Sequence, residues 1–425
     1  MGSRVRLAAF ALVCAAASFT PLAGAQNPIK IGLGIAQTGP VAAGGKAALL
    51  ALQMWRDEVN TRGGLLGRRV ELIAYDDQSS AATTPGIYAK LLDFDKVDLL
   101  IAPYGTASTV PIMPLVKRRG LLLMGNFSFQ ANQAFHHDRW FNNAPWNDAA
   151  SWCEGFFKLG KRVDAKTIAF LVADQEFSQR LASGAKAIAK EMDLTTVYDQ
   201  AYAPTTLDFS SMIRAIRAAK PDIVYVMSYP RDSVAIVHAV NEIGVGSSVK
   251  LFGGAMVGLQ FSEVTESLGS RLNGIVNYHT YVPEQTMDFP GLKEFLALYS
   301  QRAAQEKIDP LGYLSPFSYA IGQMLEQAVT ATRSLDHKVL ADYLRSNEMQ
   351  TIVGPVRYGM DGEWATPRLV MIQFRGIVDK NLEQFRQPGK QVILEPPEVR
   401  TGTLAAPFEQ AVHSGRPQGM RSTVR

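Results

Sequence analysis

The regular alternation of short apolar runs with stretches of helical periodicity is the feature of this sequence that most constrains its fold. Apolar residues between 47 and 55 recur at the spacing of one helical face, and Gly63 and Gly64 end this predicted helix. Continuous apolar strands that alternate with helices are typical of a parallel sheet covered on both faces. The predicted strands are 29–35, 70–75, 97–103 and 121–124, and the next helices are 84–94 and 107–118.

The same alternation starts again near residue 147 and predicts a second α/β unit of similar size. Its strands are 166–173, 195–199, 222–228 and 249–253, and its helices are 177–191, 208–219 and 231–243. Further helices at 290–305, 314–333 and 336–347 precede a strand at 368–374. Irregular stretches predict connectors near 140–147, 277–283 and 353–358. From Gln387 onward the chain is Pro-rich and aperiodic, and we expect disorder over 415–425.

The N-terminus has the pattern of a secretory signal peptide. Residues 1–6 carry two arginines, an apolar run covers 7–17, and Ala23-Gly24-Ala25 supplies small residues for cleavage. The apolar run is shorter than the roughly 20 residues that span a bilayer. We therefore predict that residues 1–25 are removed and that the mature chain is periplasmic.

The near-neutral net charge of the mature chain gives no electrostatic reason to expect binding to nucleic acid or to a membrane surface. Loss of the two arginines in residues 1–25 lowers the formal net charge from +4 to +2. Only Cys153 then remains of the two cysteines, so the mature chain cannot form an internal disulfide. A core of this size does not need one.

The sequence contains none of the common catalytic or nucleotide-binding motifs. A Walker loop, a G-x-G-x-x-G after a strand, an H-E-x-x-H and a G-x-S-x-G are all missing. The pair His136-His137 lies in an irregular segment, and two adjacent histidines there rarely make a metal site without further Cys or acidic ligands. Asp76-Asp77 is best interpreted as a strand-end turn. We therefore predict a protein without catalytic residues, metal or cofactor.

Three segments at predicted strand ends are candidates for ligand contact, because ligands of open parallel sheets bind beyond the carboxyl ends of the strands. The first, Ala102 to Thr109, opens a helix and carries three hydroxyls, so its free N–H groups could hold a carboxylate. One hydroxyl would suffice for a helix cap. The second is 124–129, with two aromatic residues in a loop, and the third is 228–232, which places Tyr229 toward the first unit.

In their order and spacing, five segments resemble the extracytoplasmic solute-binding proteins of branched-chain amino acid ABC transporters, which have the type I periplasmic binding fold. The resemblance covers about residues 28–400. The matching segments are IKIGLGIAQTGPVAAGG near the start, NTRGGLLGRRVELIAYDDQS at 60–79, LLIAPYGTAST at 99–109, TTLDFSSMIRAIRAAKPDIVYVMSYP at 205–230 and IVGPVRYGMDGEW at 352–364.

The resemblance implies two lobes joined by three crossovers, which fits the three predicted connectors. Lobe 1 would comprise residues 28–144 and 279–354, lobe 2 residues 146–277 and 356–400, and a C-terminal tail residues 401–425. The lobes would close around the ligand by hinge motion. The family also implies a membrane-bound ABC permease as partner, and we expect a monomer.

Carried over from the family, the ligand-binding positions are a hydroxyl and a loop of lobe 1 and aromatic residues of lobe 2. The residues that match are Tyr104, Thr106, Phe127, Ser128, Phe129, Phe177, Tyr229 and Met256. In amino-acid-binding members an acidic residue pairs the ligand ammonium, but the matching stretch here has Ala255 and no carboxylate beside it. A buried ammonium without an anionic partner is costly. We therefore expect an aromatic or apolar carboxylate as ligand.

Alternatives to this interpretation are a neutral amide or an amino acid as ligand, and a sensor that reports the same ligand to a signalling partner. An enzyme that uses the same cleft, for example a hydrolase, is a further alternative from a different class. The sequence offers no combination of nucleophile, base and orienting group for it.

Overall fold

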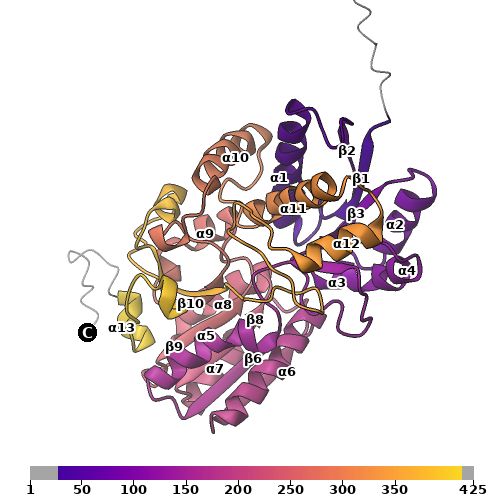
Figure 1. Cartoon of the computed structure of the whole chain (residues 1–425). Coiled ribbons are helices and arrows are strands. Elements are labelled where there is room, and N and C mark those ends of the chain that lie inside the picture. Colours follow the sequence, from indigo (N-terminus) through magenta and orange to yellow (C-terminus); the bar gives the residue numbers. More distant parts are fainter. Residues whose placement is uncertain (1–26, 414–425) are drawn as a thin grey trace, which may run out of the picture.

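The computed structural model describes residues 27–413 and folds them into two α/β lobes, each built on its own sheet (Figure 1). The predicted signal peptide and the predicted disorder at 415–425 lie outside the described residues. Both sheets are mostly parallel, so the predicted fold class is confirmed. None of the described helices combines the length and apolarity that a membrane crossing requires.

Lobe 1 contains a five-stranded, fully parallel sheet in the order β2-β1-β3-β4-β5. Its strands are β1 (Ile29–Ile35), β2 (Val70–Asp76), β3 (Leu99–Tyr104), β4 (Leu123–Asn126) and β5 (Trp140–Asn143). Its first helices are α1 (Ala42–Thr61), α2 (Thr84–Asp93), α3 (Thr106–Thr109), the 3₁₀ turn η1 (Val110–Ile112) and α4 (Met113–Arg118).

Three later helices complete lobe 1, although they follow lobe 2 in the sequence. They are α10 (Leu292–Glu306), α11 (Ser315–Thr332) and α12 (His337–Ser346). Helix α11 packs along α1, because Gly322 leaves room for the ring of Trp55; a Cβ at this glycine would stand 2.2 Å from that ring. The Trp55 Nε1–H donates to Glu326 Oε2 at 3.2 Å and fixes the pair.

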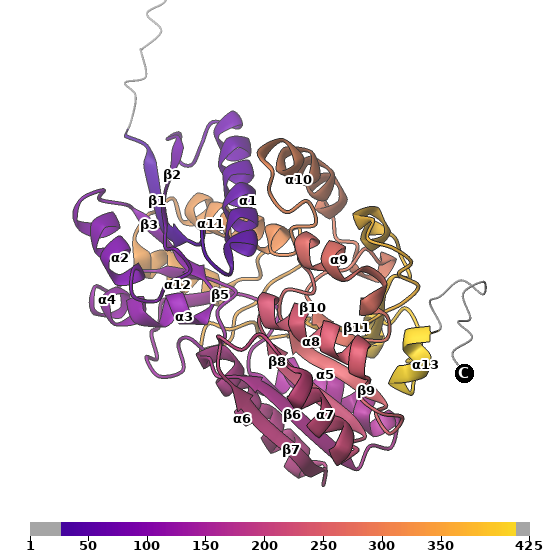
Figure 2. The same ribbon diagram turned by 180° about the vertical axis from the view of Figure 1, so that it is seen from behind.

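Lobe 2 contains a seven-stranded sheet in the order β12-β11-β10-β9-β8-β6-β7, with β11 and β12 antiparallel to their neighbours. Its strands are β6 (Thr167–Ala173), β7 (Thr195–Tyr202), β8 (Ile223–Ser228), β9 (Leu251–Met256), β10 (Val276–His279), β11 (Val370–Phe374) and β12 (Gln391–Glu395). Its helices are α5 (Ala149–Arg162), α6 (Glu176–Glu191), α7 (Ser210–Ala219), α8 (Pro230–Ile243), α9 (Ser262–Leu268) and α13 (Phe408–His413), with 3₁₀ turns η2 (Gly269–Leu272), η4 (Leu382–Arg386) and η5 (Pro397–Val399). The 3₁₀ turn η3 (Gln285–Met287) lies between β10 and α10. Helices α5 and α6 pack together, as do α7 and α8 (Figure 2).

The chain crosses between the lobes three times, as predicted. The crossing segments are 144–148 between β5 and α5, 280–291 between β10 and α10, and 347–369 between α12 and β11. Segments 144–148 and 347–369 are joined directly, because the backbone N–H of Arg368 donates to Pro145 O at 2.9 Å. The exact lobe boundaries given by the sequence stay a proposal.

The structure corrects several local predictions. The stretch 140–147 begins with strand β5 rather than being irregular throughout, and 277–283 begins inside strand β10. The predicted helix 107–118 is broken into α3, η1 and α4, which include two prolines. The aperiodic part after Gln387 contains β12, and the predicted tail is packed as far as α13, where Phe408 lies 5.4 Å from Phe252 between ring centroids.

Candidate functional site

A cavity of about 310 Å³ lies between the lobes, where the carboxyl ends of the strands of both sheets face each other. This is where open parallel sheets bind ligands. Lobe 1 contributes the ends of β1, β2, β3 and β4, and lobe 2 the ends of β6 through β10. Its lining residues include Pro40, Val41, Ser79, Tyr104, Gly105, Thr106, Ser108, Phe127, Trp146, Trp152, Gln175, Phe177, Pro204, Tyr229, Arg231, Asp232, Val257, Tyr278 and Tyr313. We call it the interlobe cavity.

The lobe 1 wall of this cavity presents the first turn of α3. The backbone N–H groups of Thr106, Ala107 and Ser108 have no acceptor within this helix, because its first i to i−4 bond runs from Thr109 N–H to Gly105 O. Within the described residues the Ser108 hydroxyl also has no partner, although the side chain is buried. These donors can receive a carboxylate.

The side chain of Thr106 holds the neighbouring loop in place. Its Oγ1 accepts the backbone N–H of Phe129 at 2.8 Å. Ser128 similarly donates to Thr109 Oγ1 at 2.8 Å, and Thr109 donates to Gly105 O at 2.8 Å. Two of the three hydroxyls that the sequence suggested as ligand donors, those of Thr106 and Thr109, therefore tie the β3 and β4 loops together.

Phe127 lies at the centre of the lobe 1 wall in a strained backbone conformation. Its φ of 57° is in the left-handed region, which is uncommon for a residue other than glycine and costs about 1–2 kcal/mol. Its ring meets Trp146 edge-on at 5.2 Å and Tyr313 at 6.0 Å between centroids. Strain of this kind persists where the surrounding packing holds the residue, and it concentrates at functional sites.

Aromatic side chains from both lobes form most of the remaining wall. Trp152 contacts Trp146 at 4.4 Å, Phe177 at 5.2 Å and Tyr278 at 4.6 Å between ring centroids, and Phe177 contacts Tyr229 at 6.2 Å. Eight aromatic rings thus line one cavity. Edges of aromatic rings carry partial positive charge, so such a wall suits the face of an aromatic ligand and a nearby anion.

The four tyrosines of the wall stay protonated at neutral pH and can donate hydrogen bonds. Burial raises the pKa of Tyr104 to about 12, and it raises the pKa values of Tyr229, Tyr278 and Tyr313 above the usual value of a phenol. The hydroxyls of Tyr104 and Tyr313 lie 2.9 Å apart and hydrogen-bond to each other.

Two charged residues at the start of α8 line the cavity. Arg231 is exposed and forms no ion pair within the described chain, so its guanidinium is available to a ligand anion. The Oδ2 atom of Asp232 accepts from the Tyr202 hydroxyl and from the backbone N–H of Tyr229. Burial raises the pKa of Asp232, which weakens its tendency to be charged.

Trp152 carries a buried donor without an acceptor. Its side chain is only 3% exposed, and among residues 27–413 no atom accepts from its Nε1–H. A buried donor left unpaired costs about 1–3 kcal/mol. The neighbouring Trp146, in contrast, donates its Nε1–H to Ser128 O at 3.3 Å.

Five of the eight sequence-predicted ligand residues line the interlobe cavity, and three lie behind its wall. Tyr104, Thr106, Phe127, Phe177 and Tyr229 are in the lining. Ser128 and Phe129 are buried in the loop behind, where the Phe129 ring packs on Trp152 and Phe177. Met256 is fully buried at the end of β9, and its N–H donates to Asn277 Oδ1 at 2.9 Å.

The end of β9, the position at which the family resemblance implies an acidic residue in amino-acid-binding members, presents an apolar side chain. Ala255 is fully buried inside β9, and Val257 is the residue after this strand that reaches the cavity.

Sequence reasoning missed Trp146, Trp152, Tyr278 and Tyr313, and it included Arg231 only as part of the candidate segment 228–232. Trp146 stands inside a segment interpreted only as a connector, and Trp152 and Tyr278 belong to elements, α5 and β10, that were not predicted. Arg231 adjoins a predicted strand end, so its position offered a signal. Tyr313 offered none, because it precedes a helix far away in the sequence.

A larger cavity of about 460 Å³ borders the interlobe cavity at Tyr313. It is lined by α10, η4 and the segment after β10, with His279 as a buried member. Burial lowers the pKa of His279 to about 3, so this imidazole is neutral. We place the ligand in the smaller cavity, because the strand ends and the first turn of α3 converge there.

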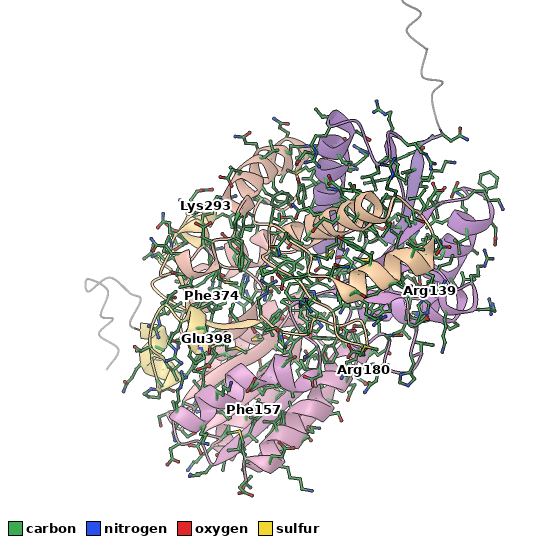
Figure 3. The ribbon with its side chains drawn as sticks, in the orientation of Figure 1. Arg139, Phe157, Arg180, Lys293, Phe374 and Glu398 are labelled. Atoms are coloured by element: carbon green, nitrogen blue, oxygen red, sulfur yellow. The ribbon has the colours of Figure 1, made fainter. Side chains whose placement is uncertain are left out.

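The interlobe position agrees with contacts between the lobes. The Phe129 ring of lobe 1 meets the Phe177 ring of lobe 2 edge-on at 5.6 Å. Arg180, which Figure 3 places where the lobes meet, donates to Gln133 Oε1 at 3.4 Å. Within the described residues, no group of three or more His, Cys, Asp or Glu side chains could hold a metal ion.

Comparisons with known proteins agree with this architecture. The model of the periplasmic binding protein family matches residues 28–375. The Leu/Ile/Val-binding protein of Escherichia coli is 21% identical over 350 residues, 82% of this chain and 91% of that protein. The structure of a branched-chain amino acid transporter substrate-binding protein from Streptococcus pneumoniae in complex with isoleucine matches with a TM-score of 0.72 and 16% identity, over 87% of this chain and 100% of that one.

A solute-binding protein of an ABC transporter from R. palustris, solved in complex with benzoate, has the same fold. It matches with a TM-score of 0.69 and 18% identity, over 87% of this chain and 96% of that one. At this identity the likeness concerns the fold. The family match covers most of the described residues, and the chain belongs to the periplasmic binding protein family.

Proposed function

We propose that this protein is the non-enzymatic, periplasmic receptor of an ABC transporter and that it binds a small aromatic carboxylate in the interlobe cavity. The observation that carries the proposal is the lining itself: eight aromatic rings, an unpaired guanidinium and no acidic residue after β9. In this proposal the signal peptide exports the chain, and the closed protein docks as a monomer on a membrane permease.

The lining suggests how each part of the ligand is held. The ring of the ligand would lie among Phe127, Phe177 and Tyr229, which come from both lobes. Its carboxylate would accept from the first turn of α3 and pair with Arg231. Charge-assisted hydrogen bonds of this kind are stronger than neutral ones. Because both lobes contribute, the ligand would favour the closed arrangement.

Support also comes from relatives. The benzoate complex from R. palustris shows that this fold can hold an aromatic acid. A solute-binding protein from Rhodopseudomonas palustris BisB5 was likewise solved with 3,4-dihydroxybenzoic acid. At 18% identity each, they support the ligand class without fixing it for this chain.

An α-amino acid is the second candidate ligand, and Asp232 is the observation that favours it. This carboxyl lines the cavity and could pair an ammonium group. Two facts weaken the candidate: Oδ2 already accepts two hydrogen bonds, and burial raises the pKa of Asp232.

A thermal-shift screen of the mature protein distinguishes the two candidates, because a ligand of the folded state raises the melting temperature. The panel contains benzoate, 4-hydroxybenzoate, phenylpropenoate, leucine, phenylalanine and benzamide. We expect the aromatic acids to stabilise the protein and leucine to have no effect. Stabilisation by the amino acids alone would contradict the proposal and assign the ammonium to Asp232. The matching Asp232→Asn variant would then lose that stabilisation.

A further inference from the structure

The cavity of about 460 Å³ that borders the interlobe cavity at Tyr313 lies beside α10, and we call it the α10 cavity. Helix α10 belongs to lobe 1, whereas β10, β12, α9 and η4, which supply much of the remaining wall, belong to lobe 2. A volume of this size is within the range of small-molecule sites in proteins. The function proposed above gives this cavity no role.

His279, the last residue of β10, lines the α10 cavity and is only 5% exposed. Its Nδ1 atom accepts the backbone N–H groups of Thr280 at 3.0 Å and of Tyr281 at 3.1 Å. Because Nδ1 accepts, the proton of the neutral ring is on Nε2. The chain that follows β10 therefore fixes both the orientation and the tautomer of this imidazole.

The Nε2–H group of His279 is a donor that faces the cavity. Within residues 27–413 it has no acceptor. Unlike Trp152 Nε1, which is completely enclosed by protein, Nε2 is not among the enclosed atoms that lack a partner. The small surface that His279 exposes lies in the wall of the α10 cavity, so a molecule in this cavity can reach Nε2–H.

Other buried polar side chains of this wall are already paired. Gln260 donates to Tyr278 O at 2.9 Å and accepts the backbone N–H of Gly258 at 3.2 Å. Thr265 donates to a backbone carbonyl in the first turn of its own helix at 3.0 Å. The imidazole of His279 is therefore a buried donor that a ligand can satisfy, and a ligand that does so must offer an acceptor.

The charged side chains of the wall are engaged by protein partners. Lys293, at the outer edge of the molecule (Figure 3), forms an ion pair with Asp288. Arg386 Nε lies 3.2 Å from Glu383 Oε1, and Glu284 Oε1 accepts a backbone N–H at 2.7 Å. Neither cation of the wall is left for an anionic ligand, and burial of an anion without a partner is costly. The wall therefore favours a neutral ligand.

Apolar side chains supply a surface for the body of such a ligand. Leu296 comes from α10, Leu311 from the segment before α11, and Phe385 from η4. One fixed donor in apolar surroundings suits a molecule with one strong acceptor and an apolar body. The oxygen of a neutral carbonyl group accepts hydrogen bonds and does not donate them, as this donor requires.

We propose that the α10 cavity is a second ligand site, which binds a small neutral carbonyl compound with its oxygen on His279 Nε2–H and its apolar body against Leu296, Leu311 and Phe385. This site is separate from the interlobe cavity, and it does not depend on the function proposed for that cavity.

The test follows the ring C–H resonances of His279 in the mature protein, labelled with ¹³C-histidine, during titration with cyclohexanone. These resonances are identified by their loss in His279→Asn. We expect cyclohexanone to shift them saturably. Cyclohexylammonium has the same ring with a head group that only donates, and cyclohexanecarboxylate is an anion. Each of these should bind at least about tenfold more weakly than the ketone.

The variant His279→Asn removes the donor and keeps the local backbone contacts. Asn places an acceptor near the position of Nδ1, where it can serve the two backbone N–H groups, but it has no donor that reaches the cavity. We expect the dissociation constant for cyclohexanone, measured by isothermal titration calorimetry, to rise about tenfold. His238→Asn makes the same change on α8, outside the cavity, and should bind cyclohexanone like the unmodified protein.

The variant Ala297→Phe tests the site without a change to the imidazole. Ala297 is exposed on α10 and lines the cavity, so a larger side chain can occupy cavity space without disturbing the core. The dissociation constant for cyclohexanone should rise several-fold. Leu298→Phe, at the next position of the helix, adds a ring outside the lining and should leave the constant unchanged.

Any of three results would overturn the proposal. The first is a His279 resonance that does not respond to millimolar cyclohexanone in the unmodified protein. The second is an equal affinity for cyclohexylammonium. The third is an unchanged dissociation constant in both His279→Asn and Ala297→Phe. A shift of the Trp152 indole signal without a shift of the His279 signal would also count against it, since it would place the ketone in the interlobe cavity.

Discussion

In the proposed function, the charge of Arg231 is the side-chain property on which carboxylate recognition depends most. Arg231→Gln removes the cation but keeps a donor, so we expect the affinity for benzoate to fall about tenfold, which corresponds to about 1.4 kcal/mol. Binding of benzamide should not change. Isothermal titration calorimetry measures both. Arg214→Gln on α7 makes the same charge change away from the cavity and should bind benzoate like the unmodified protein.

The unpaired indole of Trp152 gives a prediction with two readouts. Trp152→Phe removes a buried donor that lacks an acceptor while it keeps an aromatic ring. We therefore expect the melting temperature without ligand to stay the same or rise, and the affinity for the aromatic acid to fall several-fold. Loss of stability without loss of affinity would mean that Trp152 acts only in packing.

At the residue scale, the sequence could predict contacts that follow a strand directly. Tyr104, Thr106, Phe127 and Tyr229 each stand where an apolar run ends, and a parallel sheet brings such ends together. The sequence alone could not distinguish a residue that faces the cavity from its neighbour behind the cavity wall. The positive φ of Phe127 turns its ring into the cavity wall while Ser128 is buried beneath, and this turn has no glycine to signal it.

Among the elements, β5 and the third crossing segment are joined by a buried carboxyl. Glu363 is 4% exposed and accepts from Trp140 Nε1 at 3.0 Å and Asn142 Nδ2 at 2.7 Å. Burial raises the pKa of Glu363 to about 8. At pH values between the pKa that Glu363 has in the unfolded chain and its pKa in the folded protein, Glu363 is protonated in the folded state and ionised in the unfolded chain. Its contribution to stability is therefore lost as the pH rises through this window.

Glu363→Gln removes this titration and tests the assignment. Relative to the variant, the unmodified protein should lose at least about 2 kcal/mol of unfolding free energy between pH 5 and pH 8. Urea denaturation of both proteins at pH 5, 6.5 and 8 gives the difference, which cancels the titration of other groups. Parallel pH dependences for the two proteins would show that Glu363 has an ordinary pKa.

Helix α13 contributes to lobe 2 although its sequence looks like a tail. Phe408 is 4% exposed and its ring packs on Phe252. The backbone N–H of Phe408 donates to Val249 O at 3.1 Å. We expect Phe408→Ala to lower the unfolding free energy by about 2–4 kcal/mol in urea denaturation. Glu409→Ala, exposed on the same short helix, is the control. A negligible effect of Phe408→Ala would mean that the segment leaves the lobe readily.

The predicted elements agree best where apolar periodicity is strong. Strands 29–35 and 222–228 and helix 231–243 agree with the structure within one residue at each end. Strands β5, β10 and β12 were not predicted, because each is short and lies next to a proline-containing segment that suggests a loop. Their pairing partners are distant in sequence, so only the tertiary structure identifies them.

For the whole molecule, the paired lobes predict a ligand-dependent shape. Ring contacts such as Phe129 with Phe177 join the lobes only when they are close. We expect the radius of gyration measured by small-angle X-ray scattering to decrease when the aromatic acid is added, because in the proposed function the ligand contacts both lobes. Phe177→Ala, which removes one wall contact, should reduce this change. An identical scattering curve with and without ligand would contradict closure.

The two-lobe organisation could be predicted because the α/β pattern runs twice and three connectors interrupt it. The relative position of the lobes could not, since side chains that meet across the boundary, such as Arg180 and Gln133, are far apart in the sequence.

A crystal structure of the mature protein with the aromatic acid that stabilises it most tests the central claim most directly. The account predicts the ring among Phe127, Phe177 and Tyr229 in the interlobe cavity, with the carboxylate on the first turn of α3 and on Arg231. A ligand bound outside this cavity would contradict it. So would a structure in which the carboxylate points away from both Arg231 and α3.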